Sequence, residues 1–512
     1  MPEIVLATLN ARYAHAAMGL RCLRANLGEW RESSVIVEFV IGQKTEEMVE
    51  QILALKPRHL GLGVYIWNVT ECTRLVAQLK VVAPELTIIL GGPEVSHEID
   101  QQRICQLADY VISGWGDVSF ADLIGQLQAG LEPPAKTIAG VQPPLDRLAL
   151  PYAEYSDQDL AGRHLYVEAS RGCPFKCAFC LSALDLTAWA FPLTGFLAAL
   201  EHLYQRGARQ FKFVDRTFNL KVSSSIAILQ FFLDKITAAP DDPPFAHFEL
   251  IPDHLPERLK AMIRRFPPGT LQFEIGIQSF NPEVQALISR RQDNAAAAAN
   301  IAWLRSESGA HLHVDLIAGL PGEDLASFAA GFDRLVALAP HEIQFGILKR
   351  LRGTPLAQQA EALGLRFSPD PPYPILANRL IDFPTMQRLN RFARYFDLIA
   401  NSGRYPLSLP LLLGDRPFVR FLAFADWLYA ETRQTHAFAQ ERLVERVYRY
   451  LCEHGQTPPA SAAAALLADY RGSGGRSRLG FEAADSLLPK PAPRRTSKAT
   501  PSRQSRHLGA GA

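Results

Sequence analysis

The chain has 512 residues, of which 48% are hydrophobic, so two or three domains with sizeable cores are expected. A formal net charge of +1 provides no overall positive electrostatic potential that would attract nucleic acid or an acidic partner. Seven cysteines in 512 residues are too few for a disulfide scaffold. Because neither a signal peptide nor an apolar run of about 18 residues is present, we expect a cytoplasmic protein with no membrane partner.

Residues 1–130 alternate short β-rich runs with amphipathic segments. This alternation predicts a parallel sheet with helices on both faces, and five strands suit a flavodoxin-like Rossmann domain. The expected strands are Ile4–Thr8, Val35–Ile41, Leu60–Ile66, Thr87–Leu90 and Tyr110–Ser113. Prolines concentrate in residues 131–160, which we interpret as a linker.

Small and aromatic residues follow these strands. Leu90-Gly91-Gly92-Pro93-Glu94 comes after the fourth strand, and Gly114-Trp115-Gly116-Asp117 follows the fifth. Glycines at strand ends let the backbone approach a ligand closely. Further candidates on loops at the same edge are Asn10, Tyr13, His15, Tyr65, Trp67 and Asn68, whose alternative role is ordinary packing.

Residues 161–350 repeat the alternation at a longer period, which predicts a partial (β/α)6 barrel. In such barrels the chemistry lies at the carboxyl ends of the strands. The expected strands are Leu165–Ala169, Phe211–Val214, His247–Ile251, Leu271–Ile277, Leu312–Ile317 and Ile343–Leu348. Polar residues at or after these ends are Asp215, Glu249, Gln278, Arg290 and Asp315.

Three cysteines lie within eight residues after the first of these strands. Cys173, Cys177 and Cys180 have the spacing C-x3-C-x2-C. Structural zinc sites usually take four ligands, and ferredoxin clusters take four thiolates. Three thiolates on one loop can hold three irons of a cubane and leave the fourth iron open. The alternatives are a zinc loop or reduced surface thiols.

Helical periodicity dominates residues 351–480, which we expect to form an α-helical C-terminal domain. Residues 481–512 are basic and rich in proline, serine and glycine. Such a segment buries too little apolar surface to fold alone, so a disordered tail is expected.

The cysteine motif resembles that of the radical S-adenosylmethionine (radical SAM) enzymes, in which SAM chelates the open iron. The resemblance implies a [4Fe-4S] cluster and places Phe179 near the adenine. The barrel stretches around Gln278 and Asp315 are similar to those of anaerobic coproporphyrinogen oxidase. That likeness implies contacts from both side chains to the ribose and from Arg290 to the methionine carboxylate, where a guanidinium binds in a bidentate way. It adds Asp215 and Glu249 to the SAM site, whereas the neighbouring Arg291 is expected to form only a surface salt bridge.

The N-terminal motifs resemble the cobalamin-binding domain of one radical SAM subgroup, whose C-terminal region has no assigned function. The resemblance implies cobalamin contacts from the glycine turns and the loop residues. These are Asn10, Tyr13, His15, Tyr65, Trp67, Gly91, Gly92, Pro93, Glu94, Gly114 and Gly116. The motif D-x-H-x-x-G of enzymes with a histidine cobalt ligand is incomplete around His15, so we expect no coordination by this histidine.

The sequence therefore predicts an enzyme that generates a 5′-deoxyadenosyl radical with a low-potential electron donor of the flavodoxin or ferredoxin type. Methyl transfer or rearrangement on an unactivated carbon of a metabolite is expected, without a nucleic-acid partner. Two alternatives remain, a cobalamin-free radical SAM enzyme and a cluster- or cobalamin-dependent sensor without turnover. A tRNA-modifying variant is a further alternative, although no RNA-binding β-barrel is recognisable after the barrel.

Overall fold

The structure, a computed structural model, describes residues 2–482 and 500–508. Its contacts divide the chain into two compact units. The first unit comprises Met1–Arg216, Lys349–Ala360 and Ser368–Pro374. The second unit comprises Thr217–Leu348, Glu361–Phe367 and Ile375–Ala512. None of the described helices combines the length and apolarity needed to cross a membrane.

The first unit is built on a parallel sheet with strand order β2-β1-β3-β4-β5-β6. Helices connect consecutive strands, as parallel pairing requires. The elements in chain order are β1 (Ile4–Asn10), α1 (Met18–Ala25), β2 (Ser34–Val40), α2 (Thr45–Ala54), β3 (His59–Gly63), α3 (Val69–Val82), β4 (Thr87–Gly91), α4 (Arg103–Leu107), β5 (Tyr110–Ser113), α5 (Ser119–Gln128) and β6 (Thr137–Ala139).

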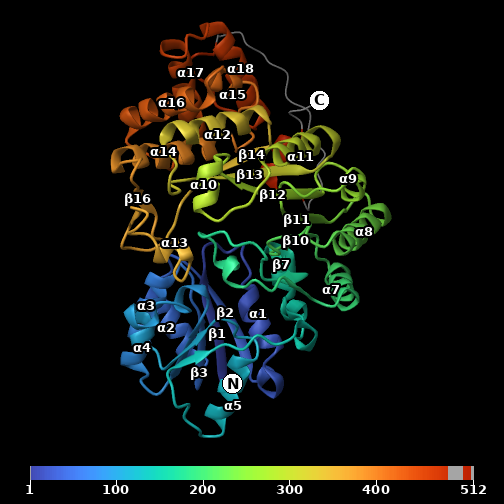
Figure 1. The fold of residues 1–512 in the computed structure, drawn as a ribbon, viewed down its shortest axis with the longest axis vertical. Helices are drawn as coiled ribbons and strands as arrows, with labels where there is room; N and C mark the ends of the chain where they lie inside the picture. Colours follow the sequence, from blue (N-terminus) through green and yellow to red (C-terminus); the bar gives the residue numbers. More distant parts are fainter. Residues whose placement is uncertain (1, 483–499, 509–512) are drawn as a thin grey trace. The chain divides into compact units, whose positions relative to one another are not determined.

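Helices lie beside the strands of this sheet (Figure 1), and they contribute to two separate apolar cores. Met48, Val76 and Ile104 from α2, α3 and α4 pack on one face. Leu20 from α1 and Phe120 from α5 pack on the other. The flavodoxin-like arrangement expected from the alternation is confirmed.

A sixth strand corrects the expected count of five. Thr137–Ala139 pairs in parallel with β5 as β6, inside the proline-rich stretch 131–160. That stretch also contains the helix α6 (Asp157–Gly162), which begins at a capping box of Ser156 and Asp159. A three-residue edge strand flanked by prolines has too little periodicity to be recognised in sequence.

The cysteine-bearing part of the first unit follows α6. Its elements are β7 (Leu165–Val167), β8 (Ser170–Arg171), β9 (Trp189–Ala190), α7 (Leu193–Gln205), β10 (Gln210–Phe213) and α13 (Pro355–Gln358). β7 pairs in parallel with β10, and β8 pairs with β9 as a short antiparallel ribbon.

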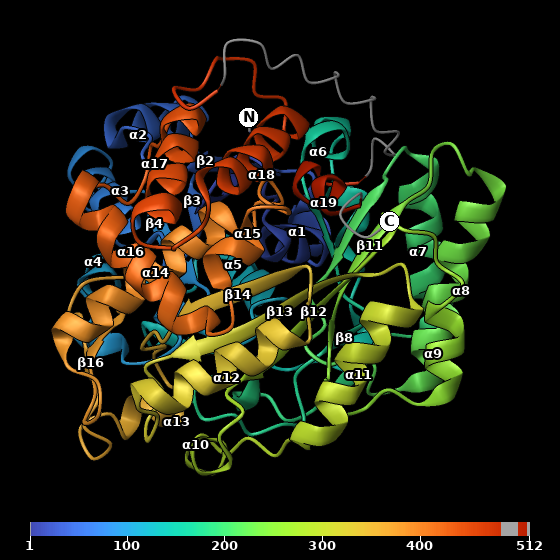
Figure 2. The same ribbon diagram turned by 90° about the horizontal axis from the view of Figure 1, so that it is seen from above.

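In the second unit, β11 to β14 pair in sequence order and in parallel. Figure 2 shows α9, α11 and α12 along one face of these strands. The elements are α8 (Val222–Ala238), β11 (Phe245–Leu250), α9 (Glu257–Ile263), β12 (Leu271–Gln278), α10 (Pro282–Leu287), α11 (Asn294–Glu307), β13 (His311–Ala318), α12 (Leu325–Ala337) and β14 (Glu342–Ile347). All six strands expected between residues 161 and 350 are present.

The C-terminal region is helical, as expected, apart from a short hairpin of β15 (Arg366–Phe367) and β16 (Ile375–Ala377). The helix α14 packs on β14 and α16, and α17 packs on α18. The helices are α14 (Phe383–Ile399), α15 (Leu409–Leu413), α16 (Pro417–Thr432), α17 (Gln440–Glu453) and α18 (Pro459–Gly472).

The expected disordered tail is wrong for residues 500–508, while 483–499 and 509–512 lie outside the described residues. The helix α19 (Ser502–His507) packs at the amino ends of β12 to β14. Arg503 Nε lies 2.9 Å from Glu342 Oε2, and Thr500 Oγ1 donates to Gly269 O at 2.7 Å. Disorder was expected because the tail has few hydrophobic residues. The contacts that hold α19 include polar ones, which hydrophobic content does not predict.

We expect a chain that ends at residue 499 to be less stable than the full chain. The truncation removes Arg503 and so leaves the buried Glu342, which is 5% exposed, without this cation. A missing partner of a buried polar group costs about 1–3 kcal/mol. Urea unfolding checks this, with a chain ending at Leu508 as the matched control because it keeps every described residue. Equal midpoints for the two truncations would contradict it.

Candidate functional site

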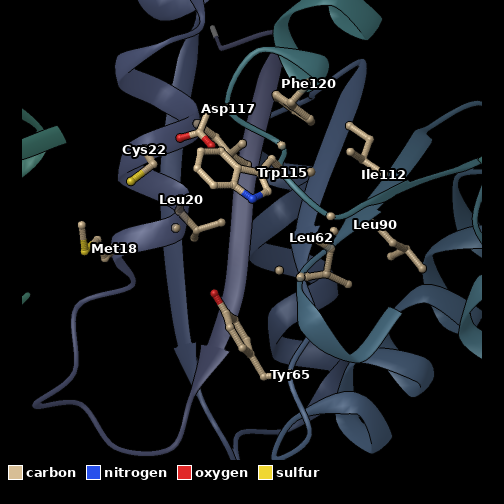
Figure 3. A pocket seen from close by; sticks show the side chains of 18 of the residues that line it. Met18, Leu20, Cys22, Leu62, Tyr65, Leu90, Ile112, Trp115, Asp117 and Phe120 are labelled. Carbon is tan, nitrogen blue, oxygen red and sulfur yellow. The ribbon is translucent and has the colours of Figure 1, made fainter. Parts of the chain in front are cut away.

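The first unit contains a cavity of about 410 Å³ at the carboxyl edge of its six-stranded sheet (Figure 3). This volume lies within the range of small-molecule pockets, about 300–1,000 Å³. Apolar side chains, several glycines and a few polar groups line it. The lining residues are Met18, Gly19, Leu20, Cys22, Leu23, Gly61, Leu62, Gly63, Tyr65, Ile89, Leu90, Gly91, Gly92, Ile112, Gly114, Trp115, Gly116, Asp117, Phe120, Glu168, Arg171 and Val214.

The two glycine turns expected to bind a ligand both lie on the cavity wall. Gly91 and Gly92 end β4, and Gly114 and Gly116 follow β5. Gly92 has φ +110°, and a Cβ there would meet Val64 O, so only glycine fits. Tyr65 also lines the cavity, stacked on Trp67 with ring centroids 4.5 Å apart. Burial raises the pKa of Tyr65 to about 12, so its hydroxyl stays protonated.

Other residues expected at this site have partners within the protein. Asn10 Nδ2 donates to Glu38 Oε1 at 2.9 Å, and Asn68 Nδ2 donates to Leu9 O at 3.0 Å. Tyr13 is half exposed under the guanidinium of Arg163. The cavity wall includes none of Asn10, Tyr13 and Asn68.

His15 and the turn residues Pro93 and Glu94 also lie outside the cavity wall. His15 Nδ1 is 2.6 Å from the Tyr166 hydroxyl, and burial lowers the pKa of this histidine. Glu94 is 3% exposed, and its Oε1 lies 2.8 Å from Arg352 Nε. The Gly-Gly-Pro-Glu motif therefore supplies glycines to the cavity and a carboxylate to an internal ion pair.

The three cysteines lie on one loop between β8 and β9. Cys173 and Cys177 are buried, and Cys180 is partly exposed. Gly172 enables the approach to this loop, because it has φ +85° and a Cβ would meet Ala188 N at 2.8 Å. Burial raises the pKa of Cys173, with smaller contributions from Cys180 and Cys177. Such a thiol needs a bound cation to ionise at neutral pH.

Asp215 forms hydrogen bonds with the residues that precede the cysteine loop. Its carboxylate accepts hydrogen bonds from Ala169 N at 2.9 Å and from Ser170 Oγ at 2.6 Å. Burial raises the pKa of Asp215 to about 7. The aspartate expected to contact SAM thus also supports the loop that carries the cysteines.

Sequence reasoning missed a charged network between the cavity and this loop. Arg171 Nη1 donates to Asp117 Oδ2 at 2.8 Å, and Arg171 Nε donates to Glu168 Oε1 at 2.8 Å. The guanidinium lies 5.0 Å from the centroid of the Trp115 ring. Asp117 and Arg171 stand within recognised motifs, but their pairing spans 54 residues and leaves no local signal.

The second unit brings together three other predicted residues. Gln278 ends β12 at a bulge, with φ +68°, and its side chain lies over Gly276. Arg290 Nη2 donates to Gly276 O, and Asp315 is paired in register with Gly276. Within the described residues, no donor reaches the buried Oε1 of Gln278. This cluster presents an acceptor, a guanidinium and a carboxylate at the carboxyl ends of β12 and β13.

Further polar side chains lie on β11, β12 and β13, and sequence reasoning did not single them out. His247 Nε2 is 3.2 Å from Glu274 Oε2, and His313 Nε2 is 3.6 Å from Asp315 Oδ1. Burial lowers the pKa of His313, so the ring is neutral at pH 7. Alternating polar residues along β12 and β13 are the signal that identifies such a polar strand face.

Family models match three parts of the chain. Residues 4–124 match a B12 binding domain, 167–335 match the radical SAM superfamily, and 361–477 match a protein family of unknown function, DUF4080. The first two matches confirm the resemblance recognised in the motifs. A radical SAM domain takes a [4Fe-4S] cluster and SAM, and a B12 binding domain takes cobalamin.

Three known proteins show the extent of the similarity. An uncharacterized methyltransferase of Pyrococcus horikoshii is 24% identical over 240 residues, which cover 41% of this chain and 51% of the relative. The chain thus spans about half the length of this curated relative. The radical SAM methyltransferase TsrM of Kitasatospora setae, solved with tryptophan substrate and a SAM analogue, has a TM-score of 0.58 at 15% identity. The match covers 72% of this chain and 78% of the TsrM chain. OxsB, a cobalamin-dependent SAM radical enzyme with aqua-cobalamin bound, has a TM-score of 0.61 at 12% identity. The match covers 92% of this chain and 79% of the OxsB chain.

The residues present fit these cofactors. Among the described residues, no three His, Cys, Asp or Glu side chains converge as ligands of a single metal ion. Three cysteines on separate irons of a cubane need no such convergence, whereas a zinc loop does. For cobalamin, the glycine-lined cavity has a volume of about 410 Å³, and its wall includes Asp117, whose buried Oδ1 has no donor among the described residues.

Proposed function

We propose that this protein, which joins a B12 binding domain to a radical SAM domain, is a cobalamin-dependent radical SAM enzyme. One observation carries the proposal. A glycine-lined cavity and a three-cysteine loop occur in the same compact unit, and Arg171, two residues before Cys173, donates hydrogen bonds to Asp117 and Glu168 on the cavity wall. A single-cofactor protein would not need this connection.

When bound, the cluster would supply an electron for the reductive cleavage of SAM, and cobalamin would supply a methyl carrier. The chain's own residues bind and orient. Cys173, Cys177 and Cys180 would hold the cluster, and Phe179 would lie against the adenine. Arg290 would grip the methionine carboxylate, because its fork matches two oxygens. Gln278, Glu249 and Asp315 would accept hydrogen bonds from hydroxyl or amino groups of SAM.

Methyl transfer to an unactivated carbon of a small molecule is the reaction that we propose, because the relatives above include methyltransferases. The reaction needs a reductant, and a flavodoxin- or ferredoxin-type donor is suited to a low-potential cluster. Sparse, scattered cysteines favour a cytoplasmic location. The partly buried polar side chains of β11, β12 and β13 favour a substrate with hydrogen-bonding groups.

Hydroxocobalamin binding tests the cobalamin part of the proposal. We expect the wild-type protein to bind it without a histidine ligand to cobalt, and His15→Ala to leave the absorption spectrum unchanged. His15 is engaged by Tyr166 and lies outside the cavity wall. The measurement is absorption titration of both proteins.

Two outcomes would contradict this expectation. A histidine-ligated spectrum that disappears in His15→Ala would assign the cobalt ligand to His15. No binding by the wild-type protein would favour the cobalamin-free alternative, in which the N-terminal domain binds another molecule.

A further inference from the structure

The Asp117 carboxylate is one of the few charged groups on the cavity wall, and its two oxygens differ in their surroundings. Figure 3 shows this side chain among the lining residues with Trp115 and Cys22. Oδ2 accepts from Arg171 Nη1 at 2.8 Å. Oδ1 is buried, and no donor among the described residues reaches it. The residue as a whole is 6% exposed, so bulk water reaches it poorly.

A buried carboxylate oxygen without a donor loses the hydration that it has in the unfolded chain. The lost hydration of this oxygen is offset when a ligand in the cavity donates a hydrogen bond to it. The remaining wall is mainly aliphatic, aromatic and glycine, so Asp117 is a specific polar contact in an apolar pocket.

Arg171 binds Oδ2 of Asp117 and leaves Oδ1 without a donor among the described residues. The guanidinium is fixed by Glu168, whose Oε1 lies 2.7 Å from Nη2, and by the Trp115 and Phe191 rings. Glu168 and Asp117 are both buried, and the Arg171 guanidinium is the cation that contacts both carboxylates. Arg171 also stands two residues before Cys173.

We propose that Asp117 accepts a hydrogen bond from the corrinoid bound in the cavity, and that Arg171 is the positioning residue that orients Asp117 for this contact. The inference rests on the proposed function and assigns a specific acceptor to it. Cobalamin offers two kinds of donor, the amide N–H groups around the corrin and the hydroxyls of its nucleotide tail. Both kinds of donor can make the same contact, a hydrogen bond from an N–H or O–H group to Oδ1 of Asp117.

The test substitution is Asp117→Asn, which preserves shape. Because Arg171 requires an acceptor, the asparagine oxygen turns toward the guanidinium and its NH2 group faces the ligand donor. We expect the dissociation constant for hydroxocobalamin to rise by about tenfold to a hundredfold, as for a lost hydrogen bond to a charged group. Asp122→Asn is the matched control, because Asp122 is exposed on α5.

Cobinamide, which lacks the nucleotide tail, distinguishes the two donors. Equal losses with hydroxocobalamin and cobinamide assign the donor to the corrin amides. A loss with hydroxocobalamin alone assigns it to the nucleotide tail. If Asp117→Asn binds both corrinoids as tightly as Asp122→Asn does, the inference is wrong.

A double-mutant cycle tests the role of Arg171. We expect Arg171→Lys to weaken hydroxocobalamin binding in the wild-type background and to add little in the Asp117→Asn background, because the two residues act as one unit. Iron content, measured on the same reconstituted samples, should stay at the wild-type value. Additive losses would show that Arg171 does not act through Asp117.

The inference and the proposed function fail in different ways. Wild-type protein that binds no corrinoid refutes the cobalamin part of the proposed function. Wild-type protein that binds hydroxocobalamin, together with an Asp117→Asn variant that binds it equally well, refutes only the role of Asp117.

Discussion

A protein in which Cys173, Cys177 and Cys180 are all changed to alanine is expected to bind no iron after anaerobic reconstitution. The wild-type protein should hold about four irons and four sulfides, because three thiolates and one open iron define a single cubane. The three cysteines lie on one loop, and among the described residues no three His, Cys, Asp or Glu side chains converge on a single-ion site. Iron and sulfide analysis, with the absorption of the cluster, measures the effect.

Cys452→Ala is the control for this experiment, because Cys452 is a partly exposed cysteine on α17 in the second unit. It should keep the full complement of iron. A triple variant that retains the cluster, or a wild-type protein with stoichiometric zinc, would refute the radical SAM assignment of this loop.

Arg290→Ala should lower the affinity for SAM at least tenfold. Arg290 is partly buried, and Gly276 O holds its Nη2 beside Gln278. Removal of this cation leaves a desolvated carboxylate of the ligand unpaired, which typically costs about 2–5 kcal/mol. Equilibrium binding of SAM and the release of 5′-deoxyadenosine with dithionite measure the loss.

Arg291→Ala is the matched control, because the neighbouring guanidinium is exposed. We expect its effect to be small. Equal losses from both substitutions would show that the twelve-residue spacing from Gln278 does not identify the binding arginine. Unchanged affinity in Arg290→Ala would remove this residue from the SAM site.

Much of the fold could be predicted because hydrophobic periodicity is local. The strands around Leu6 and Ile89 have buried residues on both faces of a parallel sheet, which produces nearly continuous apolar runs. The cysteine loop and glycine turns were also recognisable, because their chemistry requires particular residues at short spacing.

The remainder depends on partners that are distant in sequence. β6 is ordered by pairing with β5, and the segment around Arg503 is ordered by contacts with residues more than 100 positions earlier. The same reason explains why Glu94 was assigned to the cobalamin site. Its cation is Arg352, 258 residues later, so the motif around Glu94 gave no indication of an ion pair.

The discontinuity of the first unit has a consequence for synthesis of the protein. Arg350 and Arg352 return to bind Glu98 and Glu94, and Tyr373 donates to Glu94 at 3.0 Å. Domains usually fold as they leave the ribosome, amino-terminal first. Here the nascent N-terminal sheet carries Glu94 without its cation until Arg352 has emerged, and without its tyrosine donor until Tyr373 has emerged. A fragment that stops after the cysteine loop therefore lacks part of the first unit. A truncated protein that keeps the ion pairs of the B12 binding domain must also include Arg350 and Arg352.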